Sequence, residues 1–313
     1  MKLGRVLFLL AALTVCAAAT AESAKTPPVW HNAPRIAVAE KAPVIAATRA
    51  GQRIVAVGDY GIVILSDDGK RFRQAQAVPT RAVLTSVFFL DDRQGWAGTV
   101  LASSDGSENW RLLREEQGKD RVLLSIWFEN PRRGFAVGQF GLLLATEDGG
   151  QTWQERRLVD GEMGEKHLLQ IFAGGGQIFI AAEAGAIFHS GDGGRHWQGV
   201  QTDNKGSFWT GLVLADGGIL VAGMRGHIYR SDDRGATWKA VPSGTQQSIA
   251  AIAQQPDGTL RLIGNAGTDL FSADRGRSFK TGNRADRANL TALATSRQGD
   301  VLFSLGGVVA EGK

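Results

Sequence analysis

The sequence predicts an all-β fold, a seven-bladed β-propeller of four-stranded antiparallel blades. Three observations lead to this prediction: an excess of glycine, an acidic and aromatic segment that recurs at a near-constant interval, and a short apolar run in fixed register with each copy of that segment. Glycine makes up 41 of 313 residues, and the glycines separate short runs of Val, Ile, Leu and Phe. Turn residues alternating with short β-prone runs are typical of an all-β chain.

The recurring segment has the pattern Ser-x-Asp-x-Gly-x-Thr-Trp, with variation, and is best matched at 146-TEDGGQTW-153 and 231-SDDRGATW-238. Its six copies begin at Ser66, Ser103, Thr146, Ser190, Ser231 and Ser272. Their first residues are 37, 43, 44, 41 and 41 positions apart. This interval suits one four-stranded propeller blade.

Each repeat has room for four strands. The first is an apolar run such as 168-LLQIFA-173, and a polar turn separates it from a second run such as 134-GFAVG-138. A third, such as 141-GLLLAT-146, leads into the recurring segment, and a fourth is expected after its aromatic residue. A glycine stands five residues before each copy: Gly61, Gly98, Gly141, Gly185, Gly226 and Gly267.

A seventh repeat is predicted at the C-terminus. Residues 289–313 follow the same plan, with Gly307 in the turn, and stop where the outer strand should begin. The segment 28-PVWHNAPRIAV-38 offers a short extended stretch at the other end. We therefore expect the N-terminal strand to complete the last blade, since such closure removes open sheet edges.

The first residues predict a secretory signal peptide over residues 1–21. Lys2 and Arg5 precede an apolar run that ends in the small residues 19-ATA-21. Residues 22–313 are then a single propeller domain, exported to the periplasm or an equivalent extracytoplasmic compartment, with no transmembrane segment after cleavage. The only cysteine, Cys16, lies in the leader, and Val15 before it argues against a lipoprotein.

The acids of the recurring segments are predicted to be structural. Ser, Thr and Asp side chains bond the backbone of their own turn, and glycine supplies a positive φ. These acids are Asp68, Asp105, Asp148, Asp192, Asp233 and Asp274. They belong to different blades, and calcium needs six or more oxygen ligands, so we expect no metal and no cofactor.

A partner is expected at one mouth of the propeller channel. The turn between the second and third strands of a blade shares a face with the link into the next blade, whereas the recurring segments lie on the opposite face. The central residues of these turns vary from blade to blade, as a binding surface would. They are Asp59, Tyr60, Gln139, Phe140, Glu183, Met224, Arg225 and Asn265.

A cation precedes six of the seven inner strands by two or three residues. These cations are Lys41, Arg81, Arg121, Lys166, Lys205 and Arg287. Our hypothesis is a cationic ring that binds an acidic segment of a membrane or envelope protein, or another anionic ligand. The alternative is that exposed links are simply often charged. The charge of the chain without its leader, about +2, argues against nucleic acid.

The turns 138-GQFG-141, 223-GMRG-226 and 264-GNAG-267, the recurring Asp-box (BNR) segments and the export signal together resemble the photosystem II stability/assembly factor family. The resemblance covers the whole mature chain. It implies an exported β-propeller that binds partner proteins without catalysis, as an assembly, stability or accessory factor for a membrane or envelope complex in photosynthesis.

Asp-box propellers also include sialidases and other glycosidases, so this reading stays open as the alternative. A sialidase needs an arginine triad and a tyrosine nucleophile with a glutamate partner. The fragment 34-PRIA-37 matches the first arginine motif poorly, and the mature chain has only Tyr60 and Tyr229. An inverting pair of carboxylates remains conceivable from Asp59 and Glu183.

Overall fold

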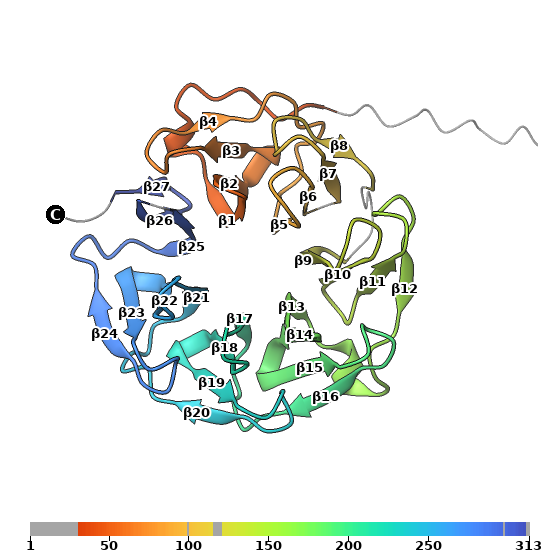
Figure 1. Ribbon diagram of the computed structural model, residues 1–313, viewed down its shortest axis with the longest axis vertical. Coiled ribbons are helices and arrows are strands. Elements are labelled where there is room, and N and C mark those ends of the chain that lie inside the picture. Colours follow the sequence, from red (N-terminus) through yellow and green to blue (C-terminus); the bar gives the residue numbers. More distant parts are fainter. Residues whose placement is uncertain (1–30, 99, 115–120, 297, 311–313) are drawn as a thin grey trace, which may run out of the picture. The chain divides into compact units, whose positions relative to one another are not determined.

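The protein is described by a computed structural model that covers residues 31–98, 100–114, 121–296 and 298–310. Seven antiparallel sheets follow one another around a ring within this part of the chain (Figure 1). The prediction of a seven-bladed, all-β propeller is therefore confirmed. The predicted signal peptide and Cys16 lie outside the described residues.

The first three blades follow the chain in order. Blade 1 contains β1 (Val44–Ala50), β2 (Arg53–Gly58), β3 (Val63–Ser66) and β4 (Arg73–Gln74). Blade 2 contains β5 (Val87–Phe89), β6 (Gly95–Ala97), β7 (Leu101–Ser103) and β8 (Arg111–Leu112). Blade 3 contains β9 (Leu123–Phe128), β10 (Gly134–Gly138), β11 (Leu143–Thr146) and β12 (Gln154–Arg156).

The remaining four blades complete the ring. Blade 4 contains β13 (Leu168–Gly174), β14 (Gln177–Ala182), β15 (Ala186–Ser190) and β16 (Gln198–Gln201). Blade 5 contains β17 (Phe208–Val213), β18 (Ile219–Gly223), β19 (Ile228–Ser231) and β20 (Lys239–Val241). Blade 6 contains β21 (Ile249–Gln254), β22 (Leu260–Gly264), β23 (Thr268–Ser272) and β24 (Lys280–Asn283). Blade 7 contains β25 (Leu290–Ser296), β26 (Gly299–Ser304) and β27 (Gly307–Val309).

Burial explains why the middle strands read as continuous apolar runs. Every residue of β10 and β11 is buried, because the neighbouring blades cover both faces of the sheet. The outer strand β12 is largely exposed. Aromatic rings fill the gaps between blades, as where Trp96 of blade 2 stacks on Phe128 of blade 3 with centroids 3.6 Å apart. The core is therefore a set of interfaces between blades.

Blade 7 closes the ring by packing against blade 1. The ring of Phe303 meets that of Phe72 edge-on, with centroids 5.8 Å apart. The Thr291 hydroxyl donates to the Val44 carbonyl at 2.7 Å, which joins the two inner strands. Closure within the described residues thus relies on side-chain packing and one side-chain hydrogen bond.

The expectation that the N-terminal strand completes the last blade is wrong for residues 31–38. None of these residues is in a strand, and the seventh sheet has three strands among the described residues. The segment instead follows the outer edge of blade 1, where the Ala33 amide donates to the Val78 carbonyl at 2.9 Å and the Arg35 guanidinium to the Ala75 carbonyl at 2.7 Å. The outer strand β4 is only two residues long, so it leaves these carbonyls available.

The helical elements of the described chain are short 3-10 turns. They include η1 (Ala39–Lys41), η2 (Asp59–Gly61), η3 (Glu162–Glu165), η4 (Glu183–Gly185), η5 (Met224–Gly226) and η6 (Asn265–Gly267). None of them has the length and apolar character that a membrane-spanning helix requires.

Candidate partner-binding face

The turns between second and third strands lie beside the links that lead into the inner strands. The Gln139 amide donates to the Val122 carbonyl at 3.0 Å, and the Asn265 amide to the Ser248 carbonyl at 2.9 Å. The link after blade 3 reaches the same turn, since the Gly141 amide donates to the Lys166 carbonyl at 2.9 Å. We call the surface formed by these turns and links the turn face.

Glycines at the ends of these turns, two in blades 1, 3, 5 and 6 and one in blade 4, allow the turns to fit between two links. A Cβ atom on Gly138 would lie 2.1 Å from the Val122 oxygen, and one on Gly141 would lie 1.9 Å from the Gly164 oxygen. Gly58, Gly223 and Gly264 make the same close approach to the link before their own blade, while Gly61, Gly185, Gly226 and Gly307 make it to the link after. The recurring glycines are therefore set by backbone contact.

The two central residues of each turn have different roles. In blades 3 and 4 the first supports a link, since the Glu183 carboxylate accepts the His167 amide hydrogen at 2.9 Å and the Gln139 side chain accepts that of Val122 at 3.2 Å. The second adopts a positive φ. The residues in this conformation are Tyr60, Phe140, Ala184, Arg225 and Ala266.

Exposure follows this division. Tyr60 is 60% exposed and Phe140 is 56% exposed, and Arg225 is also exposed. The first central residues Asp59, Gln139, Glu183, Met224 and Asn265 are all half-buried. Of the turn residues predicted from the sequence, Tyr60, Phe140 and Arg225 are thus the most exposed to solvent.

The six cations before the inner strands are all on links, but they are not equivalent. Arg121 forms a bidentate pair with Glu155 of the outer strand β12, with N–O distances of 2.8 and 2.7 Å. Arg81 donates to the Asn32 carbonyl at 3.1 Å. Lys166 is half-buried, whereas the exposed members of the set are Lys41, Arg81, Lys205 and Arg287.

Inside the turn face, the inner strands of all seven blades line a channel of about 470 Å³. Six inner strands carry one extra, unpaired residue near their start: Ile45, Leu124, Leu169, Trp209, Ala250 and Thr291. Each extra residue lies beside the end of the second strand, just before the turn, and lines the channel. The set therefore forms a mainly apolar collar at the channel mouth. The described lining contains no charged side chain. Sequence periodicity gave no signal for these bulges.

The opposite face carries the recurring segments, which form closed hydrogen-bonded turns. The Thr146 hydroxyl donates to the Asp148 carboxylate at 2.8 Å and accepts the Gly150 amide hydrogen at 2.9 Å. The second carboxylate oxygen accepts the Thr152 hydroxyl at 2.5 Å. This hydroxyl, followed by the Thr152 amide, lowers the pKa of Asp148 to about 2. Both carboxylate oxygens are thus used within the turn.

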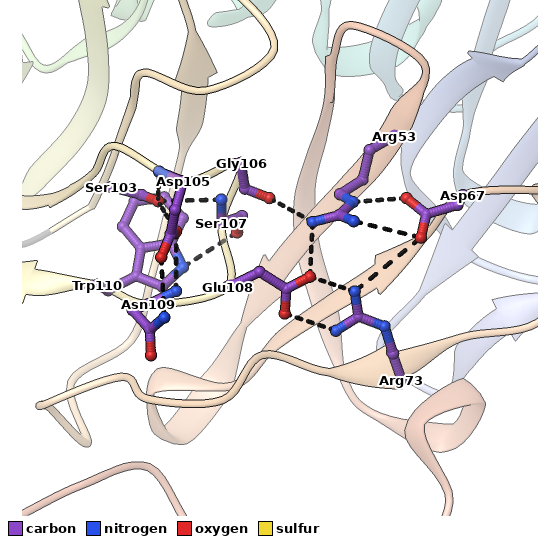
Figure 2. Close-up of polar contacts among 10 residues, drawn as sticks. All are labelled: Arg53, Asp67, Arg73, Ser103, Asp105, Gly106, Ser107, Glu108, Asn109 and Trp110. Carbon is purple, nitrogen blue, oxygen red and sulfur yellow. Dashed lines mark hydrogen bonds and ion pairs between the residues drawn. The ribbon is translucent and has the colours of Figure 1, made fainter.

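Side chains of the preceding blade also donate hydrogen bonds to these Asp-box turns, as Figure 2 shows for Arg53 and Gly106. The fourth residue of a box has a positive φ, and in four of the boxes its carbonyl accepts a side-chain hydrogen bond across the blade interface. Arg53 donates to Gly106 at 2.9 Å, and Trp96 to Gly149 at 3.1 Å. Arg133 donates to Gly193 at 2.5 Å in the same way. The box face therefore uses its polar groups to join blades.

Two of the residues considered for catalysis, Tyr229 and Glu183, are engaged in other contacts. The Tyr229 hydroxyl donates to the Asp203 carboxylate at 2.5 Å, and burial together with this bond raises the pKa of Tyr229 to about 12. Asp59 and Glu183 stand on blades 1 and 4, and Glu183 holds a backbone amide. Among the described residues, no cluster of three or more His, Cys, Asp or Glu could hold a metal ion.

The seven blades, the Asp-box turns on one face and the glycine-bounded turns on the other define an Asp-box β-propeller. A family model described as "Photosynthesis system II assembly factor YCF48" matches residues 101–307, and the chain belongs to this family. A curated relative is the Photosystem II assembly lipoprotein Ycf48 of Synechococcus sp. (strain CC9902), which is 32% identical over 134 residues. That match spans 41% of this chain and 40% of the relative's length.

Solved structures share the fold. "YCF48 bound to D1 peptide" is 17% identical with a TM-score of 0.68, over 91% of this chain and 96% of that one. "YCF48 from Cyanidioschyzon merolae" is 16% identical with a TM-score of 0.67, over 90% and 97%. A streptogramin B lyase is 11% identical with a TM-score of 0.71, over 90% and 97%. At these identities the likeness concerns the fold alone.

Proposed function

We propose that this protein is an exported, non-catalytic propeller that assists photosystem II assembly by binding a segment of D1 through its turn face. Membership of the YCF48 family supports the assembly role. A solved YCF48 structure of the same fold carries a D1 peptide, which supports the choice of partner. The extracytoplasmic location rests on the predicted signal peptide and on the lipoprotein name of the cyanobacterial relative.

One observation favours the turn face over the box face. Box carboxylates such as Asp148 and box carbonyls such as Gly106 are bonded within the protein. The turn face instead projects Tyr60, Phe140 and Arg225 from rigid turns. Exposed aromatic and arginine side chains on a rigid backbone are the groups that most often dominate protein interfaces.

The direction of the carboxyl pKa shifts also favours a binding role over hydrolysis. A glycosidase needs one carboxylic acid with a raised pKa to protonate the leaving group. Several carboxyl groups of the described residues, Asp148 and Glu108 among them, have clearly displaced pKa values, and in each case hydrogen bonds or ion pairs lower the pKa.

The test uses overlapping synthetic peptides that cover D1, with the mature chain as the binding protein. Reversal of Lys205 and Arg225 to Glu should lower the affinity for the bound peptide at least about tenfold. A matched reversal of Lys70 and Lys280, two exposed cations of the box turn and outer strand, should leave it unchanged. Failure of every D1 peptide to bind, or equal loss in both variants, would overturn the proposal.

The glycosidase alternative has its own readout. Purified protein should show no turnover of a panel of aryl glycosides. Turnover that disappears in both Asp59→Ala and Glu183→Ala would contradict a purely binding role.

A further inference from the structure

The exposed apolar side chains of this protein gather on one part of one face. Seven large hydrophobic residues of the described chain are 45% to 60% exposed, and five of them are in turns or links of the turn face. These five are Leu305, Tyr60, Val83, Val122 and Phe140. The other two are Val38, in the N-terminal segment, and Phe271, in β23.

The five residues lie on four consecutive blades. Leu305 is in the turn of blade 7, Tyr60 in that of blade 1 and Phe140 in that of blade 3. Val83 and Val122 lie in the links that enter blades 2 and 3. Blades 7, 1, 2 and 3 follow one another around the ring (Figure 1), so we call these residues the apolar arc. Neighbouring exposed apolar groups of this kind mark interaction sites.

The rest of the turn face has a different chemistry. The turns of blades 4, 5 and 6 present Ala184, Arg225 and Ala266 in place of the large apolar residues. Lys205 and Arg287 are exposed on the links into blades 5 and 7, and with Arg225 they form what we call the cationic arc.

Cations within the apolar arc are less available. Arg121 is paired with Glu155, and Arg81 donates to the Asn32 carbonyl, although Lys41 is exposed there. The turn face is therefore divided into a half with large exposed apolar side chains, whose cations Arg81 and Arg121 are bonded within the protein, and a half with exposed cations and no such apolar side chain.

We propose that the turn face binds an amphipathic protein segment in one orientation, with its apolar side chains on the apolar arc and its carboxylates on the cationic arc. This inference rests on the proposed function, because it specifies what the bound segment must look like. Charge complementarity sets the direction of the segment, and burial of apolar side chains supplies affinity that salt does not screen.

The same division disfavours a bilayer as the occupant. An anionic membrane would attract the cations, but the turn face also carries Asp59, Glu165 and Asp203. Asp203 and Glu165 stand beside the very links that carry Lys205 and Lys166. A flat anionic surface would have to bury these acids, whereas a peptide can place its carboxylates on the cations and leave these acids in water.

The direct test compares two synthetic peptides of identical composition by fluorescence anisotropy. In the block peptide, Leu and Phe occupy one half and Glu the other, and in the alternated peptide the same residues are interleaved. The mature chain should bind the block peptide about tenfold more tightly. Equal affinities would overturn the proposed orientation.

Two sets of variants separate the halves of the turn face. Tyr60→Asn, Phe140→Asn and Leu305→Asn together remove apolar surface, and asparagine tolerates the positive φ at Tyr60 and Phe140. Lys205→Glu, Arg225→Glu and Arg287→Glu together reverse the cationic arc. Each set should weaken block-peptide binding about tenfold, and only the second loss should shrink at high salt. Phe271→Asn and the box-face reversal of Lys70 and Lys280 serve as controls, with melting temperatures to verify folding.

The outcomes distinguish this inference from the proposed function. D1 binding that depends on the turn face, with no preference for the block peptide, removes the inference and leaves the function. Absence of D1 binding with a strong block preference removes D1 as the partner and leaves the orientation. Binding to phosphatidylglycerol vesicles that the apolar-arc variant abolishes, without peptide binding, would replace the inference with a membrane surface.

Discussion

Arg53 of blade 1 donates from Nη1 to the Gly106 carbonyl in the Asp-box of blade 2 at 2.9 Å. The same guanidinium pairs with Asp67 at 2.6 Å and with Glu108 at 2.8 Å (Figure 2). The arginine side chain is 22% exposed, so water offers it little replacement for these contacts. It joins the first two blades on the box face.

Arg53→Met should therefore lower the free energy of unfolding by about 1 to 3 kcal/mol, because it leaves Glu108 and the Gly106 carbonyl with fewer donors. Urea unfolding followed by tryptophan fluorescence measures this. Arg49→Met is the matched control, since Arg49 is in the same blade and forms solvent-exposed hydrogen bonds with the Gly51 carbonyl of its own hairpin. Equal losses in the two variants would contradict a role for Arg53 in joining the blades.

The turns pack closely against the links, so two glycine substitutions should differ in how much they lower the free energy of unfolding. Gly141 and Gly175 both have positive φ, +67° and +57°, so alanine costs about 1 kcal/mol of backbone strain at each. Only Gly141 would place its new Cβ against a backbone oxygen, at 1.9 Å, while Gly175 faces open space. Gly141→Ala should lose about 1 to 3 kcal/mol more than Gly175→Ala in thermal or urea unfolding. A similar loss at both positions would show that the turn adjusts without cost.

The box carboxylates predict a loss of stability in acid. The pKa values of Asp148 and Asp233 are lowered from 3.8 to about 2, in each case chiefly by the following threonine hydroxyl. A carboxyl whose pKa is lower in the folded than in the unfolded chain stabilises fully above the unfolded pKa. That stability is lost as the pH falls from about 4 to about 2.

The measurement is the urea midpoint at several pH values between about 5 and 2, for the mature chain and for Asp148→Asn with Asp233→Asn. The double variant should be less stable at pH 5 and should lose less on acidification. Because hydrogen bonds lower these pKa values, added salt should change the difference little. Parallel pH profiles for the two proteins would refute this assignment.

The Arg121–Glu155 pair predicts a gain of binding. Glu155→Gln removes a carboxylate charge paired with Arg121 and so makes the net charge near the turn face more positive by one. Affinity for the glutamate-bearing block peptide should rise about two- to fivefold at low salt, a modest effect because both side chains are partly exposed. Glu147→Gln, which weakens an ion pair with Arg133 on the box side, is the control. An unchanged affinity in Glu155→Gln would place Arg121 outside the binding surface.

The repeat pattern was enough to predict the ring, because the glycines before each box and the box residues are required by local backbone geometry. Gly141 fits only where no Cβ exists, and Asp148 bonds its own turn, so both leave a local signature. The ring closure was less predictable. Residues 31–38 could extend either blade 7 or blade 1. They lie along blade 1, where the two-residue strand β4 leaves backbone carbonyls available.

The position of the turn face was predictable from the sequence, and the contacts within it were less so. The fixed distance from each Asp-box segment located Tyr60, Phe140 and Arg225. The repeat could not show that the Glu183 side chain accepts a backbone amide hydrogen, or that Arg121 pairs with Glu155 of the outer strand. The apolar arc was also missed, because Val83 and Leu305 lie outside the G-x-x-G positions and their exposure is a property of the folded ring.

Site-specific photocrosslinking to a D1 peptide tests the central claim most directly. A photoreactive phenylalanine analogue replaces Tyr60, Phe140 or, as the matched control on another part of the surface, Phe271. If the turn face is the binding surface, positions 60 and 140 should crosslink to the peptide, excess unlabelled peptide should suppress the products, and position 271 should give none. Crosslinking from position 271 with none from positions 60 and 140 would contradict partner binding at the turn face.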